Sequence, residues 1–208
     1  MKLYYAETLM PRKACAVARH LGSPVEFVRV DLQKGEQRTP EYAALNPNLK
    51  VPVLVHDGGS LWESNAIMCF LARAAGSDLW PGDGDRQVEA MRWLCWDLMH
   101  FTRYTGELYF EHVIKADFGI GEPDPAAVEE AMGYVRKYAR ILDDHLKGRR
   151  FLVGDGLTVA DFAVAIALPY AARARIPLAD YPEVARWHAR LEELPAWREP
   201  FPAVDAAA

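Results

Sequence analysis

The segment of residues 50–67 constrains the fold more than any other part of the chain. Two short apolar runs, residues 53–55 and 60–62, flank Asp57-Gly58-Gly59. An Asp-Gly pair between such runs is a strong signal for a β-hairpin. Pro52 cannot donate to a sheet ladder, so it stands at the start of its strand. The backbone N–H and C=O of its neighbour Val51 are therefore free to pair with an extended ligand.

A helix is predicted to begin directly after the hairpin, at Ser64. The Ser64 hydroxyl would lie beside unpaired backbone N–H groups at the start of that helix, and such groups attract carboxylates. Val51 and Ser64 together predict a binding site for a small, extended, anionic peptide.

The composition is that of a soluble globular protein with one large domain or two small ones. Of the 208 residues, 51% are apolar and 25% are charged. The formal net charge of −5, without a basic stripe, argues against nucleic acid as a partner. No apolar run approaches the roughly 20 residues that span a membrane. The chain also enters its first strand without an apolar signal segment, so we expect a cytoplasmic protein.

The cysteines and histidines predict neither a disulfide framework nor a metal site. Cys15, Cys69 and Cys95 are odd in number and widely spaced, which fits a reducing compartment. The chain has no C-x-x-C pair, and its six histidines share no short spacing.

The order of the predicted elements indicates an α/β domain followed by an all-helical domain. Strand and helix patterns alternate over the first eighty residues, which implies one mixed sheet with helices on it. Besides the hairpin, we predict strands at 3–5 and 27–30 and helices at 12–21, 40–45 and 64–75. No convincing strand follows, and helices are predicted at 87–115, 126–146, 158–172 and 181–194. We place the first domain at residues 1–77, a linker at 78–86 and the helical domain at 87–208.

Four motifs in this order resemble the cytosolic glutathione transferases, and the likeness covers the whole chain. The motifs are Asn46-Pro47 through Val51-Pro52-Val53-Leu54, Glu63-Ser64-Asn65-Ala66-Ile67, Leu157-Thr158-Val159-Ala160-Asp161-Phe162 and Leu194-Pro195-Ala196-Trp197. The resemblance implies a thioredoxin-like domain with a four-stranded mixed sheet, a helical-bundle domain, glutathione as co-substrate and a homodimer. In the third motif, Thr158 and Asp161 read as a capping box with a structural role.

The resemblance assigns each part of glutathione to a residue. Pro52 would be cis, which turns the Val51 backbone toward the cysteinyl unit. Glu63 would face the γ-glutamyl ammonium, Ser64 and the helix start would take the γ-glutamyl carboxylate, and Lys50 would reach the glycyl carboxylate. Purely structural interpretations stay open: a trans proline that starts a strand, a serine that only caps a helix, and two solvated charges.

The residue that would stabilise the glutathione thiolate is less clear from the sequence. A free thiol has a pKa of about 8.5, so a hydrogen-bond donor or a helix N-terminus is needed to favour the anion at neutral pH. The family places a hydroxyl or a cysteine in the loop after the first strand, yet residues 6–12 contain neither serine nor cysteine. Thr8 is the preferred donor and Tyr5 the second. The third alternative is no hydroxyl, with backbone N–H groups near Met10 or the Arg12 guanidinium assisting instead.

The second substrate is expected to be a small apolar electrophile. Its site would be lined by Leu9, Met10, His100 and Tyr104, with Trp96 as a further candidate, although ordinary core packing explains such residues equally well. The expected activity is conjugation of glutathione to that electrophile. The alternatives are a glutathione-dependent peroxidase or disulfide reductase, and a non-catalytic glutathione-binding carrier or interaction protein.

Overall fold

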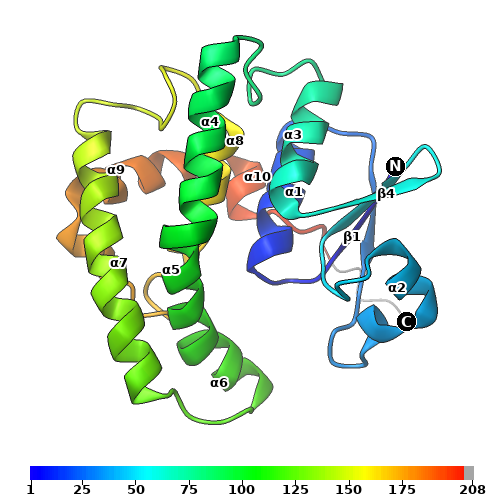
Figure 1. The fold of residues 1–208 in the computed structure, drawn as a ribbon, viewed down its shortest axis with the longest axis horizontal. Coiled ribbons are helices and arrows are strands. Elements are labelled where there is room, and N and C mark those ends of the chain that lie inside the picture. Colours follow the sequence, from blue (N-terminus) through cyan, green and yellow to red (C-terminus); the bar gives the residue numbers. More distant parts are fainter. Residues whose placement is uncertain (204–208) are drawn as a thin grey trace. The chain divides into compact units, whose positions relative to one another are not determined.

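The computed structural model describes residues 1–203, and these form two compact units (Figure 1). The first unit contains Met1–Trp80 together with residues 193–203, and the second is Pro81–Glu192. The division after Trp80 falls inside the linker that the sequence suggested at 78–86. The stretch from Glu193 onward groups with the first unit, whereas the sequence reading extended the helical domain to the C-terminus.

The first unit is built on a four-stranded mixed sheet of the thioredoxin-like type. Its strands are β1 (Lys2–Tyr5), β2 (Glu26–Arg29), β3 (Val53–His56) and β4 (Gly59–Trp62), in the order β2-β1-β3-β4. The β1 strand pairs parallel with β2 and antiparallel with β3, so Leu3 lies between Phe27 and Leu54. The predicted fold class is therefore confirmed.

The predicted hairpin turn is formed by Asp57 and Gly58. Both residues have positive φ, 46° and 76°, between the paired residues His56 and Gly59. Two such residues give the turn whose twist matches the twist of the flanking strands, and Asp-Gly adopts it readily.

Four helices complete the first unit: α1 (Leu9–His20), α2 (Pro40–Leu45), α3 (Ser64–Ala74) and α10 (Pro195–Arg198). Small residues such as Ala14 and Ala18 are fully buried on α1, which packs against α3 and α10. The sequence predicted that α1 starts at residue 12, but it starts at Leu9. Pro11 is compatible with this earlier start, because N–H groups in the first turn of a helix lack partners in any case.

The second unit is entirely helical. The predicted helix 87–115 is a continuous rod with two π-helical interruptions: α4 (Gly84–Trp96), η2 (Asp97–Phe101), α5 (Thr102–Tyr109), η3 (Phe110–Ile114) and α6 (Lys115–Phe118). The long α7 (Pro125–Leu146) runs alongside α5, and α8 (Val159–Val164) and α9 (Pro182–Leu191) follow (Figure 1). Within residues 1–203, no helix joins enough length to enough apolar character to cross a membrane.

The helix predicted at 158–172 is much shorter than expected, because α8 ends at Val164. Beyond it, Leu168 N–H donates to Ala165 C=O and Tyr170 N–H to Ala167 C=O, which are the tighter bonds of 3₁₀ geometry. Pro169 has no N–H to give to Ala165, so an α-helical bond cannot form there. The apolar pattern alone predicted too long a helix, because it takes no account of the missing N–H of Pro169.

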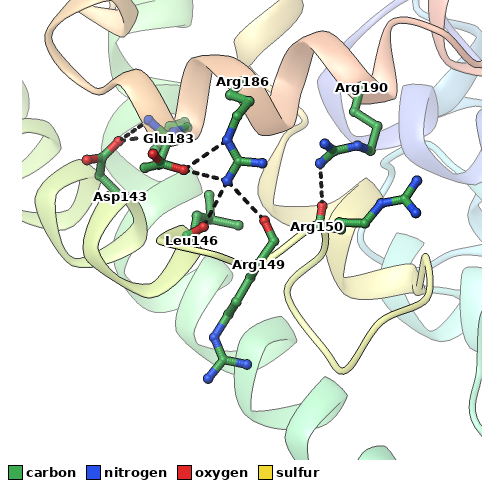
Figure 2. A network of polar contacts seen from close by, with 8 residues as sticks. Asp143, Leu146, Arg149, Arg150, Glu183, Arg186 and Arg190 are labelled. Carbon is green, nitrogen blue, oxygen red and sulfur yellow. Dashed lines mark hydrogen bonds and ion pairs between the residues drawn. The ribbon is translucent and has the colours of Figure 1, made fainter.

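The end of α7 is tied to α9 by hydrogen bonds from arginine side chains to backbone carbonyls (Figure 2). The Arg186 guanidinium donates to the carbonyls of Leu146 and Arg149, both at 3.0 Å, and also contacts Glu183. From the other side, Asp143 accepts hydrogen bonds from the backbone N–H groups of Glu183 and Val184. Each helix thus provides hydrogen-bond partners for backbone groups that are left unpaired at the end of the other helix.

Replacing Arg186 with alanine should lower the free energy of unfolding by about 1–2 kcal/mol, because carbonyls at the end of α7 lose a charged donor. Urea denaturation of wild type and variant measures this difference. The control is Arg140→Ala, since Arg140 is an exposed α7 residue whose side chain makes no hydrogen bond within residues 1–203. If both variants unfold at the same urea concentration, the capping role of Arg186 is refuted.

Candidate functional site

A cavity of about 210 Å³ in the first unit brings together residues from three separate segments. They come from the start of α1, from the loop before β3 and from the junction of β4 and α3. The lining consists of Met10, Asn46, Asn48, Lys50, Val51, Pro52, Glu63 and Ser64. All five residues that the sequence suggested for glutathione binding therefore line one cavity.

The loop before β3 is held in place by Asn46, which is buried. Its Nδ2 donates to the Lys50 carbonyl at 2.7 Å, and the Tyr42 hydroxyl donates to the same carbonyl at 2.9 Å. The Oδ1 of Asn46 accepts from the backbone and side-chain nitrogens of Asn48. These bonds fix the position from which Lys50 and the following residue enter the cavity.

The Val51–Pro52 peptide bond is cis, as the sequence predicted. The N–H and C=O of Val51 make no hydrogen bond within the described part of the chain. The wall of the cavity therefore offers one free donor and one free acceptor of an extended backbone, which is the arrangement that pairs with a peptide strand.

The start of α3 forms the opposite side of the cavity. Ser64 is its first residue and is buried, and no side chain caps the first amides of the helix. A helix start with uncapped amides favours an anion. Within residues 1–203, the only hydrogen-bonding contact of the Ser64 hydroxyl is with the Met10 sulfur, at 3.9 Å. Because a thioether is a weak acceptor, this hydroxyl can readily donate to an incoming carboxylate.

Glu63 holds an unusual backbone conformation next to the cavity, with φ of 72° and ψ of 111°. Positive φ is uncommon for residues other than glycine, and such strain concentrates at functional sites. Glu63 also places a negative charge at the end of the cavity where α3 begins, while Lys50 provides a positive charge in the lining. The cavity thus has groups for an ammonium and for carboxylates.

Glu63→Gly should raise the free energy of unfolding by about 1 kcal/mol, because glycine adopts this φ without steric cost. Denaturant unfolding of the unliganded protein measures the change. The same substitution at Glu41, in the first turn of α2, should lower stability, because glycine is unfavourable in a helix. A Glu63→Gly variant no more stable than wild type would show that Glu63 stores no such strain.

The predicted donors to the thiolate lie outside the lining of this cavity. Thr8 precedes α1 as its N-cap, and its hydroxyl makes no hydrogen bond within residues 1–203. Tyr5 is buried, with its ring stacked on Phe201 and edge-on to Phe27, and burial is the main cause of its raised pKa. The Arg12 guanidinium is buried and donates to the Trp197 carbonyl at 2.6 Å.

Thr8 differs from the other two side chains, because its hydroxyl makes no hydrogen bond within residues 1–203 and it stands two residues before Met10 in the cavity wall. Tyr5 and Arg12 take part in packing and hydrogen bonding inside the first unit. The amides at the start of α1 have no side-chain cap.

The residues suggested for the second substrate divide between the two units. Leu9 is buried and Met10 lines the cavity in the first unit. In the second unit, the His100 ring lies 4.9 Å from that of Tyr138, and the Tyr104 ring stacks on Tyr134 at 4.2 Å. His100 and Tyr104 therefore belong to one aromatic cluster that joins η2 and α5 to α7.

Two lining residues, Asn46 and Asn48, were not named as site residues from the sequence. Asn46 was noted only as part of the first family motif, although asparagine readily makes local hydrogen bonds of this kind in turns.

Trp96 belongs to the aromatic cluster of the second unit. Residues 1–203 contain no group of three or more His, Cys, Asp or Glu that could hold a metal ion.

Comparison with known proteins agrees with the geometry of this cavity. The family profile described as the N-terminal domain of glutathione S-transferase matches residues 1–73, and the profile of the C-terminal domain matches residues 96–195. Disulfide-bond oxidoreductase YfcG of Escherichia coli K12 is 30% identical, covering 93% of this chain and 91% of that protein. Glutathione S-transferase 3 of Zea mays is 31% identical, with coverage of 96% and 93%.

A solved structure of a glutathione transferase family member from Pseudomonas fluorescens, with two glutathione molecules bound, is also similar. It is 26% identical to this chain and superimposes with a TM-score of 0.84, over 96% of this chain and 91% of that one.

Proposed function

We propose that this chain, which belongs to the glutathione S-transferase family, binds glutathione in the cavity of its first unit and conjugates it to small apolar electrophiles. The observation that carries the proposal is the convergence of Lys50, the free Val51 backbone, Glu63 and Ser64 on that single cavity. Their charges and hydrogen-bonding groups complement those of glutathione from one end to the other.

In this proposal, glutathione lies extended along the cavity wall. Its γ-glutamyl ammonium faces Glu63, and its γ-glutamyl carboxylate accepts from the Ser64 hydroxyl and the first amides of α3. The cysteinyl backbone pairs with Val51. The glycyl carboxylate lies toward Lys50, and Asn48 provides a further donor in the same part of the lining.

The thiolate would be stabilised by the Thr8 hydroxyl and by the start of α1. No acidic residue stands in the first turn of α1, and Glu7, just before it, is paired with Arg29. Each unit by which the thiol pKa falls corresponds to about 1.4 kcal/mol. One charge-assisted hydrogen bond supplies about that much or more. The thiolate then forms a carbon–sulfur bond with the electrophile, and the leaving group departs with its electron pair.

A second candidate is thiol–disulfide exchange on the same platform. The relative named as a disulfide-bond oxidoreductase favours it, and so does the atypical loop Leu9-Met10-Pro11. Here the glutathione thiolate attacks one sulfur of a disulfide, a new sulfur–sulfur bond forms, and the other sulfur leaves as a thiolate.

We further propose a cytoplasmic homodimer. Apolar side chains are exposed along α4 and η2, namely Val88, Met91, Leu98 and Met99, and exposed apolar surface of this kind commonly marks an interface. The three cysteines are free, as expected in a reducing compartment. Light scattering coupled to size exclusion tests the dimer, and a monomer at micromolar concentration refutes it.

The proposed function is tested by the ultraviolet absorbance of the thiolate, measured against pH with glutathione bound. We expect the bound thiol to titrate at least one unit below the free value of about 8.5. S-methylglutathione, which has no thiol, is the blank. Two of the protein's own thiols should contribute little near neutral pH, because burial raises the pKa of Cys15 and raises that of Cys69 to about 11. The same blank subtracts the contribution of the exposed Cys95.

Two variants identify the donor. In Thr8→Ala the thiol pKa should return toward the free value, whereas Tyr5→Phe should leave it lowered. Turnover of a chlorodinitrobenzene-type substrate, compared with reduction of a glutathione mixed disulfide, separates conjugation from exchange. An unshifted thiol pKa with neither activity would sink both candidates and leave a non-catalytic glutathione-binding protein.

A further inference from the structure

The second unit contains a larger cavity, of about 830 Å³, that the proposed function does not use. It runs along one face of α7, between this helix, the loop before it, His112 of η3 and Arg175. Its volume lies in the range of small-molecule sites. Every lining residue belongs to the second unit.

The lining of this cavity carries two positive and two negative side chains. Arg136 and Arg175 provide guanidinium groups, and Glu122 and Glu129 provide carboxylates. None of these four side chains makes a hydrogen bond or ion pair within residues 1–203. Several other ionic side chains of this unit are paired, for example Arg173 with Asp117. All four residues are exposed, so the rim of the cavity has charges of both signs that a ligand from solvent can reach.

Three further observations indicate a site rather than an accidental hollow. The Nε2 atom of His112 is buried and has no hydrogen-bond partner within the described residues, which is rare for a polar atom. His112 lies in the π-helical segment η3, and such segments are frequent at functional sites. Arg175 has a φ of 56°, a strained conformation that also concentrates at ligand sites.

The geometry points to a site for a small zwitterion, an amino acid or dipeptide with an apolar side chain, held between the carboxylates and guanidiniums of this cavity. Its carboxylate would be bound by Arg136 or Arg175, since a guanidinium fork matches a carboxylate. Its ammonium would lie at Glu129 or Glu122. Its side chain would contact the apolar part of the lining, which includes Val128 and Met132.

The spacing along α7 suits a ligand of this length. Glu129 and Arg136 lie on the same face, seven residues and about 10 Å apart along the helix axis. An extended dipeptide spans about 7 Å, and the two long side chains can cover the difference. A simple anion would leave the two carboxylates unmatched, and a simple cation would leave the two guanidiniums unmatched. Only a ligand with both charges matches the whole lining.

The test is calorimetric titration of the full chain with leucyl-leucine, its N-acetyl form and its C-terminal amide. The free dipeptide should bind at least about tenfold more tightly than either blocked form, because each block removes one charge-assisted interaction. Glu129→Gln should weaken binding of the free dipeptide but leave the N-acetyl form unchanged. Arg136→Gln should weaken the free dipeptide but leave the amide unchanged.

Neighbouring residues provide matched controls. Glu130→Gln and Arg140→Gln make the same changes on α7 outside this cavity, and both should bind the dipeptide like wild type. Equal affinity for the free and blocked peptides, or no heat of binding at millimolar dipeptide, would overturn the inference.

Discussion

Replacing Ser64 with alanine should weaken glutathione binding by about ten- to a hundredfold, because a hydrogen bond to a charged group is worth about 1.5–3 kcal/mol. The Ser64 hydroxyl is the buried donor at the start of α3, and it is engaged only by the Met10 sulfur. A carboxylate replaces that weak contact with a charge-assisted one. Calorimetric titration of glutathione into wild type and variant measures the loss.

The fold should tolerate this change. Ser64 is the first residue within α3 and its hydroxyl donates to no backbone group, so removing the hydroxyl breaks no helix cap. Thermal unfolding of the unliganded variant is expected to match wild type. Ser64→Thr keeps the hydroxyl and should retain most of the affinity. Ser60→Ala, in the exposed strand β4, is the control for the substitution itself.

If Ser64→Ala binds glutathione as tightly as wild type, the γ-glutamyl carboxylate does not bind at the start of α3, and the proposed orientation in the cavity is wrong.

The proposed glutathione-binding half of the site could be predicted because its residues are close together in sequence and act largely through the backbone. A proline at a strand start, an Asp-Gly turn and a helix start at Ser64 each have a local signature. The register of β3 against β4 then carries the loop before β3 and the start of α3 to one place. These local signatures do not depend on contacts between segments that are distant in sequence.

The donors to the thiolate were harder to predict, because their availability depends on contacts between distant segments. Tyr5 ends its strand like a catalytic tyrosine, but Phe201, almost two hundred residues later, stacks on its ring. The Arg12 side chain is likewise engaged by the Trp197 carbonyl. A sequence shows that a hydroxyl or guanidinium exists near a site, but not which distant residue has already engaged it.

The Thr158–Asp161 capping motif of the helical unit has a long-range role that its local sequence pattern does not indicate. The sequence predicted that Asp161 reaches back to Thr158, and its carboxylate does accept from the N–H and the hydroxyl of that residue. It also accepts from the Leu152 N–H at 3.0 Å and from the Trp187 indole N–H at 2.9 Å. One buried carboxylate therefore joins α8, the preceding loop and α9.

Asp161→Ala should lower the free energy of unfolding by about 3–5 kcal/mol, since it leaves several buried donors without an acceptor. Burial alone raises the pKa of Asp161, and its four donors oppose that shift, so much of the stability of the ion depends on them. Because domains are stable by only about 5–15 kcal/mol, this loss is a large fraction of the total stability. Urea denaturation followed by tryptophan fluorescence measures the loss.

Two comparisons separate this network from a simple volume effect. Asp161→Asn keeps the size of the side chain but turns an amide N–H toward groups that are themselves donors, so it should also destabilise, though less than alanine. Asp155→Ala removes an exposed carboxylate from the nearby turn and should change stability by less than about 0.5 kcal/mol. If Asp161→Asn were as stable as wild type, the negative charge would be dispensable.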